Sequence, residues 1–495
     1  MQKKQVIVVG AGIAGLTAGI YAQKCGFEVT LLERHHSAGG MCTSWKRGDY
    51  LFEGGMHWLS GSNKNVATNK MWRHIGALDD AVEVDYDEPF LEYDHMGIPI
   101  RLYRDVDVTE RDLLALSPVD GKEVKKFCND IRKLKNITDT ITDLRGVRVT
   151  KKNRSSLSAL FAFLPIISVM SNYAKISREQ YVNRFAHEGI REMFRSIPSE
   201  KQGMPMLFLT LSSLARGDGG FPKGGSLPFV ERIINKYTSL GGKILYKTHV
   251  NRIVTKNDKA VGIIAGERRF DGDAVIVTVD TMAMDYLFET PPKAPWLDKM
   301  YKVTKPTMVT FVFLGINVDL TRYPKYYIFK LKKAICLSDQ TYKYLSVNNY
   351  AADRAYAPEG KTVMTIQLPG DTYDFWEKIK RDNDYTEEKR RIVKEVIAAI
   401  TAQMPEVAGQ IEVGDVATPL SYERYCANWK GSWMTEVTPD MNFKPYPAVI
   451  KGLGHIYFAG HRMMPPGGLL SALMSGRTAV QHLCRDTETL FISEE

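Results

Sequence analysis

The sequence predicts an α/β protein with a parallel sheet, and three features of the first 33 residues support this prediction. Residues 5–9 are an apolar run of strand length. Gly10, Gly12 and Gly15 follow with the spacing Gly-x-Gly-x-x-Gly. A helix-like segment then leads to a second apolar run, which ends on Glu33. A strand, a glycine-rich turn, a helix and a strand with a terminal acid are typical of a Rossmann-like dinucleotide-binding unit.

Each residue of this unit has a physical role. Gly10 allows the tight turn out of the strand, Gly12 lets the backbone approach a pyrophosphate, and Gly15 lets the helix pack close to the sheet. The unpaired amides at the start of that helix would face the phosphates. Glu33 would accept hydrogen bonds from a ribose diol, and its charge would repel a 2′-phosphate.

Composition and cysteine usage indicate the class of protein. With 495 residues, of which 44% are hydrophobic and 25% charged, the chain is globular and long enough for two or more domains. The six cysteines contain no Cys-x-x-Cys, so neither a zinc site nor a disulfide framework is expected. No apolar segment with a cleavage site precedes the first strand. These features predict a cytoplasmic protein.

The net charge of +9 has several interpretations. It could favour an anionic membrane surface or acidic ligands, or it could be spread evenly without a specific role. The basic clusters resemble solvated helix faces, and no helix-turn-helix, RNA-binding or zinc-finger pattern accompanies them. Nucleic acid is therefore not expected to be a partner.

Residues 157–170 form a strongly apolar stretch that Lys151, Lys152 and Arg154 precede. At this length, and with Pro165 inside it, the stretch is too short to span a bilayer. Three interpretations stay open: a core helix pair broken at Pro165, a buried wall of a hydrophobic substrate tunnel, or a peripheral membrane contact with basic residues at the headgroups.

Further along the chain, two glycine pairs precede a region of mixed character. Gly39-Gly40 would admit close contact between backbone and cofactor, and Gly54-Gly55 lies beside His57. Charged helical segments are expected near residues 112–144. A helix at 228–240 and strands at 243–246, 249–256, 260–266 and 274–280 would complete the cofactor domain. Strands at 308–318, 334–337 and 363–367 and a helix at 387–404 follow.

The end of the chain repeats the strand, glycine turn and helix. Residues 456–460 are an apolar strand ending in glycine, residues 465–468 a glycine turn, and residues 473–483 a helix. This arrangement presents backbone amides to an acceptor-rich ligand. A long flavin cofactor that is held at both ends would need such a second element.

Four segments together resemble one known family: Gly10-x-Gly12-x-x-Gly15…Glu33, Gly39-Gly40, Gly220-Phe221-Pro222-x-Gly224-Gly225, and Tyr457-Phe458-Ala459-Gly460…Pro465-x-Gly467-Gly468-Leu469…Ser475-Gly476-Arg477. They look like the phytoene desaturase and carotenoid isomerase family, which includes the retinol saturases and belongs to the FAD-dependent amine oxidase superfamily. The resemblance implies a discontinuous, glutathione reductase-like FAD-binding domain at 1–85, 215–290 and 445–495. It also implies a mixed α+β substrate domain at 86–214 and 291–444.

The resemblance also implies a set of FAD contacts. The pyrophosphate, adenosine, ribityl chain and isoalloxazine would be held by Gly10, Gly12, Ile13, Ala14, Gly15, Glu33, Arg34, Gly39, Gly40, Met41, Gly55, Met56, Val250, Gly460, His461, Gly468, Leu469 and Leu470. Two positions depart from the family pattern. His461 stands where an acid or amide is usual, and Pro466 stands where a third glycine is usual.

The implied chemistry is hydride transfer at flavin N5, acting on carbon-carbon double bonds of an apolar, polyene or lipid-like substrate by desaturation, saturation or isomerisation. Saturation needs a proton donor, and His57 is the candidate; alternatively it packs beneath the flavin ring. Two interpretations of the aromatic segment 422–433 stay open: it lines the substrate cavity, with Tyr425 and Trp429 on one helix face, or its aromatic residues pack in the core.

Two other functions stay open: a flavin amine oxidase, and a flavin-holding lipid-binding protein without turnover. The electron partner is not identified. No Ser-His-Asp set, metal site or P-loop pattern is found in the sequence.

Overall fold

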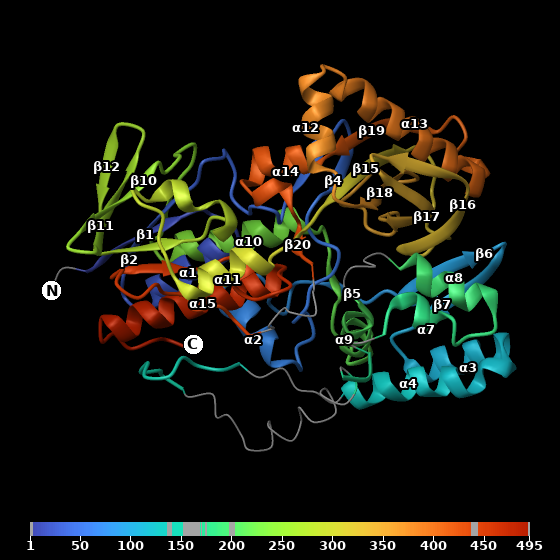
Figure 1. Cartoon of the computed structure of the whole chain (residues 1–495), viewed down its shortest axis with the longest axis horizontal. Helices are drawn as coiled ribbons and strands as arrows, with labels where there is room; N and C mark the ends of the chain where they lie inside the picture. The colour runs from blue at the N-terminus through green and yellow to red at the C-terminus, as the bar shows by residue number, and fades with distance from the viewer. Residues whose placement is uncertain are drawn as a thin grey trace.

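We describe a computed structural model of the chain for residues 3–135, 141–151, 169, 171–173, 176–197, 203–436 and 444–493. Two sheets organise it (Figure 1). A five-stranded parallel sheet lies in the left half of that view, and a seven-stranded mixed sheet in the right half. The stretch 157–170, for which three interpretations were open, falls outside the described residues except for Val169.

The parallel sheet confirms the α/β prediction. Its strands are, in spatial order, β21 (Ile456–Phe458), β13 (Ala274–Val277), β1 (Gln5–Val9), β2 (Glu28–Leu32) and β9 (Lys243–Leu245). All neighbouring pairs are parallel. Since strands so far apart in sequence share one sheet, three stretches of the chain build this unit.

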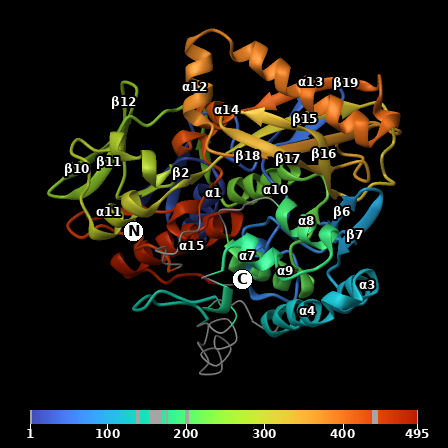
Figure 2. The ribbon, with the colours of Figure 1, turned by 45° about the vertical axis from the view of Figure 1, so that its right-hand side comes forward.

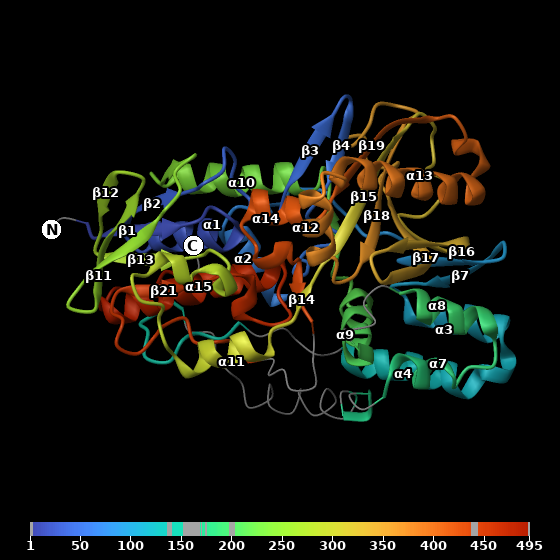
Figure 3. The ribbon, with the colours of Figure 1, turned by 45° about the horizontal axis from the view of Figure 1, so that its top comes forward.

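The two faces of the parallel sheet are covered differently because side chains alternate along β1. Val6 and Val8 pack with the helices α1 (Ile13–Lys24), α10 (Ser226–Ser239) and α15 (Leu469–Asp486). Ile7 and Val9 pack with the antiparallel strands β10 (Arg252–Lys256), β11 (Lys259–Ala265) and β12 (Arg268–Asp271) and with α11 (Pro295–Val303). Figure 3 shows α10, α1 and α15, the helices that pack with Val6 and Val8.

The second sheet has the order β19-β15-β18-β17-β16-β6-β7. Its strands are β19 (Ile411–Ala417), β15 (Val309–Ile316), β18 (Thr362–Pro369), β17 (Gln340–Asn349), β16 (Tyr326–Leu337), β6 (Leu91–His95) and β7 (Ile98–Leu102). Only β16 and β6 run parallel within this sheet. Along β15, Val312, Leu314 and Ile316 face the helices α12 (Tyr373–Arg381) and α13 (Tyr385–Gln403). Phe311 and Phe313 point the opposite way, toward the core that contains Val6, Val8 and the helices α1, α10 and α15.

Helices cover the remaining surfaces. Figure 2 shows α12 and α13 above the seven-stranded sheet, with α3 (Val106–Leu116) and α4 (Gly121–Lys135) at the opposite end of the molecule. The other helices are α2 (Ala67–His74), α7 (Arg178–Val182), α8 (Glu188–Ser196), α9 (Gly203–Ala215) and α14 (Pro419–Cys426). Short strand pairs join β3 (Ser44–Arg47) to β4 (Tyr50–Glu53), β5 (Val84–Asp85) to β8 (Phe221–Pro222), and β14 (Pro306–Thr307) to β20 (Met434–Thr435). Among the described helices, none combines the length and apolar character needed to cross a bilayer.

Several expected boundaries are corrected. The strand expected at 249–256 begins at Arg252, and the one expected at 274–280 ends at Val277. The strand expected at 334–337 is only the end of β16. The helical segments expected near 112–144 are the end of α3 and the whole of α4, which ends at Lys135; Ser117 and Pro118 separate the two helices.

Gly15 offers a test of how closely α1 must approach β1. A Cβ at Gly15 would lie 2.0 Å from the carbonyl oxygen of Gly10, which is backbone and cannot rotate away. We expect Gly15→Ala to lower the free energy of unfolding by about 1–3 kcal/mol, since α1 must shift from the sheet. Gly121→Ala is the control, because its Cβ would meet no atom closer than 3.5 Å. Equal unfolding midpoints for the two variants in urea would contradict the expectation.

Candidate cofactor and substrate site

One large cavity lies between the two sheets. Its volume is about 1800 Å³, which exceeds the roughly 300–1,000 Å³ of a typical small-molecule site. Residues at the ends of four of the five parallel strands line it: Gly10, Glu33 and Thr278 directly follow β1, β2 and β13, and Gly460 lies two residues after β21. Ligands of open α/β sheets bind at these carboxyl ends. The cavity therefore has room for a substrate beside a dinucleotide.

The start of α1 is open toward the cavity. Gly12 is the N-cap residue, no side chain caps the helix, and no acid lies in its first turn. Gly12 also pairs with Gly39, and a Cβ on Gly12 would lie 3.9 Å from the Cα of Gly40. The two glycine segments thus form a narrow cradle, with helix amides available to an anion.

Glu33 lies at the carboxyl end of β2, nearly buried. One carboxyl oxygen accepts from the amide of Ala11 and the other from the amide of His35, each at 2.8 Å. Each oxygen keeps a further lone pair that a ribose hydroxyl can use. The guanidinium of Arg34 donates to the carbonyl oxygens of Glu423 and Arg424, which anchors it to α14.

Val250 is buried beside this region and also lines the cavity. Its backbone N–H and C=O have no hydrogen-bond partner among the described residues. Buried backbone groups are almost always paired, so an adenine edge suits this position.

The start of α15 closes the other end of the cofactor region. Gly468 is its N-cap with φ of +92°, a conformation that favours glycine, and no side chain caps the helix. The amide of Gly460 donates to the Ser475 hydroxyl at 3.0 Å. The Nε2 atom of His461 is buried and has no partner among the described residues. The amides at the start of α15 are therefore open to a ligand.

Of the predicted cofactor residues, all but one line the cavity. These are Gly10, Gly12, Ile13, Ala14, Glu33, Arg34, Gly39, Gly40, Met41, Gly55, Met56, Val250, Gly460, His461, Gly468, Leu469 and Leu470. Gly15 does not, because it lies on the face of α1 that packs against Gly10. Three features of the cavity fit a dinucleotide cofactor. They are the uncapped starts of α1 and α15, the unpaired Nε2 atom of His461 and the unpaired backbone of Val250.

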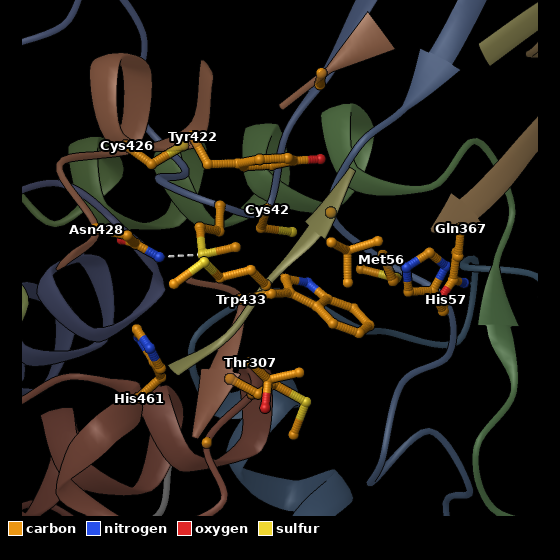
Figure 4. A pocket seen from close by; sticks show the side chains of 18 of the residues that line it. Cys42, Met56, His57, Thr307, Gln367, Tyr422, Cys426, Asn428, Trp433 and His461 are labelled. Carbon is orange, nitrogen blue, oxygen red and sulfur yellow. Dashed lines mark hydrogen bonds between the residues drawn. The ribbon is translucent and has the colours of Figure 1, made fainter. Parts of the chain in front are cut away.

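His57 lines the cavity, and Figure 4 shows it on the opposite side from His461. Its ring stacks on Phe311 and meets the edge of Trp433, with centroid distances of 5.9 and 5.0 Å. Nδ1 hydrogen-bonds with the side-chain nitrogen of Asn348 at 2.7 Å. Burial, with a smaller effect of Lys325, lowers the pKa of His57 to about 4, so the ring is neutral at pH 7.

The aromatic segment is only partly as expected. Tyr422 and Trp433 line the cavity, and the Tyr422 hydroxyl donates to the carbonyl of Gly54 at 2.9 Å. The expectation that Tyr425 and Trp429 share a helix face is wrong. The helix α14 ends at Cys426 because Ala427 adopts φ of +58°, and Trp429 begins a separate 3₁₀ turn.

Several cavity residues were not found from the sequence. No local motif marks Asn348, Gln367 and Thr307; Gln367 is placed by the pairing of β18 with β15, and Thr307 by that of β14 with β20. Glu53, which supports the cavity without lining it, had a signal: it is an acid at the end of an otherwise apolar strand, directly before Gly54-Gly55.

A comparison with family models identifies the chain. The model of the flavin-containing amine oxidoreductases matches residues 13–484. The chain belongs to this family. Its cofactor is FAD, since the family contains flavin and the first 33 residues form a dinucleotide-binding unit. The family and the enzyme class predicted from the motifs are thereby confirmed.

Curated relatives of this flavoenzyme chain are distant in sequence but cover most of it. Prolycopene isomerase 2 of an Oncidium hybrid cultivar is 22% identical, over 98% of this chain and 84% of its own. The 4,4′-diapolycopene oxygenase of a Methylomonas species is 23% identical, over 98% and 99%. The all-trans-retinol 13,14-reductase of Danio rerio is 23% identical, over 86% and 76%.

Solved structures of flavoenzymes share the fold. An oxidoreductase from Methanosarcina mazei is 17% identical with a TM-score of 0.60, covering 96% of this chain and 100% of its own. Cyclohexylamine oxidase from Brevibacterium oxydans is 13% identical with a TM-score of 0.61, over 98% and 100%. At these identities the likeness confirms the fold and carries nothing about the substrate.

Glu33 offers a test of the adenosine end. We expect Glu33→Ala to weaken FAD binding about tenfold or more, because hydrogen-bond acceptors at the ribose position are lost. The measurement is the dissociation constant of FAD, from the quenching of its fluorescence by apoprotein. Glu28→Ala is the matched control, since Glu28 lies on the same strand and is absent from the cavity lining. Equal affinities for both variants would contradict the placement of the ribose.

The buried histidines predict how stability depends on pH. Burial lowers the pKa values of His57, His461 and His482 to about 4, and Arg462 further lowers that of His461. Between pH 6.5 and about 4 the unfolded chain binds these protons and the folded chain does not, so stability falls as the pH falls through this window. In His461→Gln the proton uptake on unfolding should drop by about one, measured from urea unfolding across the window. If the free energy of unfolding of His461→Gln changed with pH as steeply as that of the wild type, this expectation would be contradicted.

Proposed function

We propose that this flavoenzyme acts on carbon-carbon double bonds of an apolar, polyene or lipid-like substrate. The observation that carries the proposal is the single cavity that joins the dinucleotide-binding unit to an apolar wall. That wall is built by Met56, Trp58, Phe90, Leu91, Leu102, Leu207, Leu211 and Ile328, from β6, β7, α9, β16 and the loop after β4. A long apolar chain would bury its surface there and exclude water from the reacting carbons.

The curated relatives support this substrate class. Their names state that they act on prolycopene, diapolycopene and retinol. They also differ in reaction, being an isomerase, an oxygenase and a reductase, so they support the class of substrate more strongly than the direction of reaction.

The proposal assigns distinct tasks to the chain. When bound, FAD accepts or donates hydride at N5. The amides at the start of α1 and of α15 would hold its phosphates and pyrimidine edge, and Glu33 its ribose. His57 is the candidate proton donor for saturation; since its ring is neutral, delivery of the Nε2 proton would leave an imidazolate, which would take a proton back from water.

The proposal includes the division of the chain into an FAD-binding domain at 1–85, 215–290 and 445–495 and a substrate domain at 86–214 and 291–444. It also includes a cytoplasmic location with peripheral contact to a membrane. The apolar stretch 157–170, the basic residues before it and the net charge of +9 support that contact.

An anaerobic experiment tests the function. The bound flavin is reduced by light and mixed with a conjugated polyene, and the absorbances of oxidised flavin and polyene are followed together. We expect flavin absorbance to return while polyene absorbance falls in equal molar amount, because one hydride and one proton saturate one double bond.

Two outcomes would contradict the proposal. Bleaching of oxidised enzyme by amines, without any reaction of polyenes, would identify an amine oxidase. A flavin that neither polyenes nor amines oxidise or reduce would indicate a lipid-binding protein without turnover. Polyene isomerisation at constant flavin absorbance would keep the substrate class and change the reaction.

A further inference from the structure

The side chain of His57 is held in one orientation. The hydroxyl of Tyr326 donates to its backbone carbonyl. Its ring lies against Phe311 and Trp433, and only 5% of the residue is exposed. A ring packed in this way cannot turn to find new partners without disturbing the aromatic wall.

Asn348 determines which ring nitrogen carries the proton. The side-chain nitrogen of Asn348 lies 2.7 Å from Nδ1 of His57. An amide nitrogen donates and does not accept, so Nδ1 must be the acceptor. Because the ring is neutral, its proton is on Nε2.

The Nε2–H group is a donor without an acceptor. It is buried and has no hydrogen-bond partner among the described residues, while the ring lines the cavity. A buried polar group without a partner destabilises a fold, because it has lost its hydrogen bonds to water and gained none in return. A bound ligand with an acceptor atom would remove this penalty.

A second unpartnered polar side chain lies on the same wall. Gln367 is opposite Phe311 on β15 and opposite Ser346 on β17, and Ser346 and Asn348 share one face of β17. Figure 4 shows the Gln367 side chain on the His57 side of the cavity. It makes no hydrogen bond to any described residue and lines the cavity.

We propose that the substrate carries a hydroxyl or carbonyl oxygen on its apolar chain, and that His57, positioned by Asn348, donates Nε2–H to this oxygen beside Gln367. This inference rests on the proposed function and narrows it to oxygenated chains over pure hydrocarbons. A protonated amine suits the site less well: an ammonium group can donate to the Gln367 carbonyl, but it cannot accept from Nε2–H, and the Lys325 ammonium lies nearby.

The test compares two ligands that share one conjugated chain, a polyene hydrocarbon and its terminal alcohol. Quenching of tryptophan fluorescence in the holoenzyme reports binding, since Trp433 lies against the His57 ring. We expect the wild type to bind the alcohol about tenfold or more tightly than the hydrocarbon. In His57→Phe the ratio of the two dissociation constants should approach one, and His57→Gln, which keeps an N–H donor, should restore part of the preference.

The outcomes separate the two proposals. Equal affinity of the wild type for both ligands, or an unchanged ratio in His57→Phe, would overturn this inference while the proposed function stands. If neither ligand binds or reoxidises the reduced flavin, the proposed function fails and this inference with it. Turnover of both ligands reduced by the same factor in His57→Phe, at an unchanged binding ratio, would assign His57 to proton delivery and overturn the binding role.

Discussion

The geometry of the cavity depends on one buried carboxyl group, that of Glu53. It accepts six hydrogen bonds: from the amides of Gly55 and Met56, the amide and hydroxyl of Ser226, and the hydroxyls of Ser44 and Tyr356. These donors come from the turn before His57, the first turn of α10, the β3 hairpin and the loop between β17 and β18. The carboxyl therefore connects the cofactor side of the cavity to the substrate side. Removing it would leave these donors unpaired inside the protein, which costs more than the bonds themselves contribute.

A buried ion pair supports the part of the cavity wall that carries His461. Asp280, after β13, and Arg462, after β21, approach to 2.6 Å with side chains almost fully excluded from solvent. Desolvation opposes ionisation of Asp280, but the charge and hydrogen bond of Arg462 outweigh it and lower the pKa of the carboxyl. Asp280 also accepts from the amide of Trp429, and Arg462 donates to the hydroxyls of Thr435 and Ser432. Since both ions also hydrogen-bond to neighbouring groups, the pair holds the turn that carries His461 against the segment leading to Trp433.

The sequence predicted what depends on local spacing and missed what depends on long-range pairing. The dinucleotide-binding unit was recognised because its glycines and Glu33 lie within 33 residues, and the turn before α15 was recognised for the same reason. The strands β6 and β19 were missed, since their place in the sheet follows from distant pairings such as Tyr327 with Glu92. The strands β7 and β17 were missed as well, although each forms a hairpin with the strand before it. Asn348 and Gln367 become neighbours of His57 only through the register of β15, β17 and β18. The error at Tyr425 and Trp429 came from Ala427, whose left-handed conformation the periodicity of the segment did not reveal.

Two buried polar side chains four residues apart, Glu53 and His57, show how structural and functional groups differ in this protein. Every hydrogen bond that Glu53 accepts comes from the chain itself, so its environment is complete without a ligand. His57 is held as firmly, by Asn348 and two aromatic rings, yet one of its nitrogens is buried without a partner among the described residues. Packing alone would be served by a phenylalanine, which carries no polar atom to leave unpaired. A hydrogen-bond donor held in one orientation in an apolar wall is explained if a bound ligand supplies its acceptor. The same reasoning applies to His461 and to the backbone of Val250 at the cofactor end, where the expected ligand is FAD.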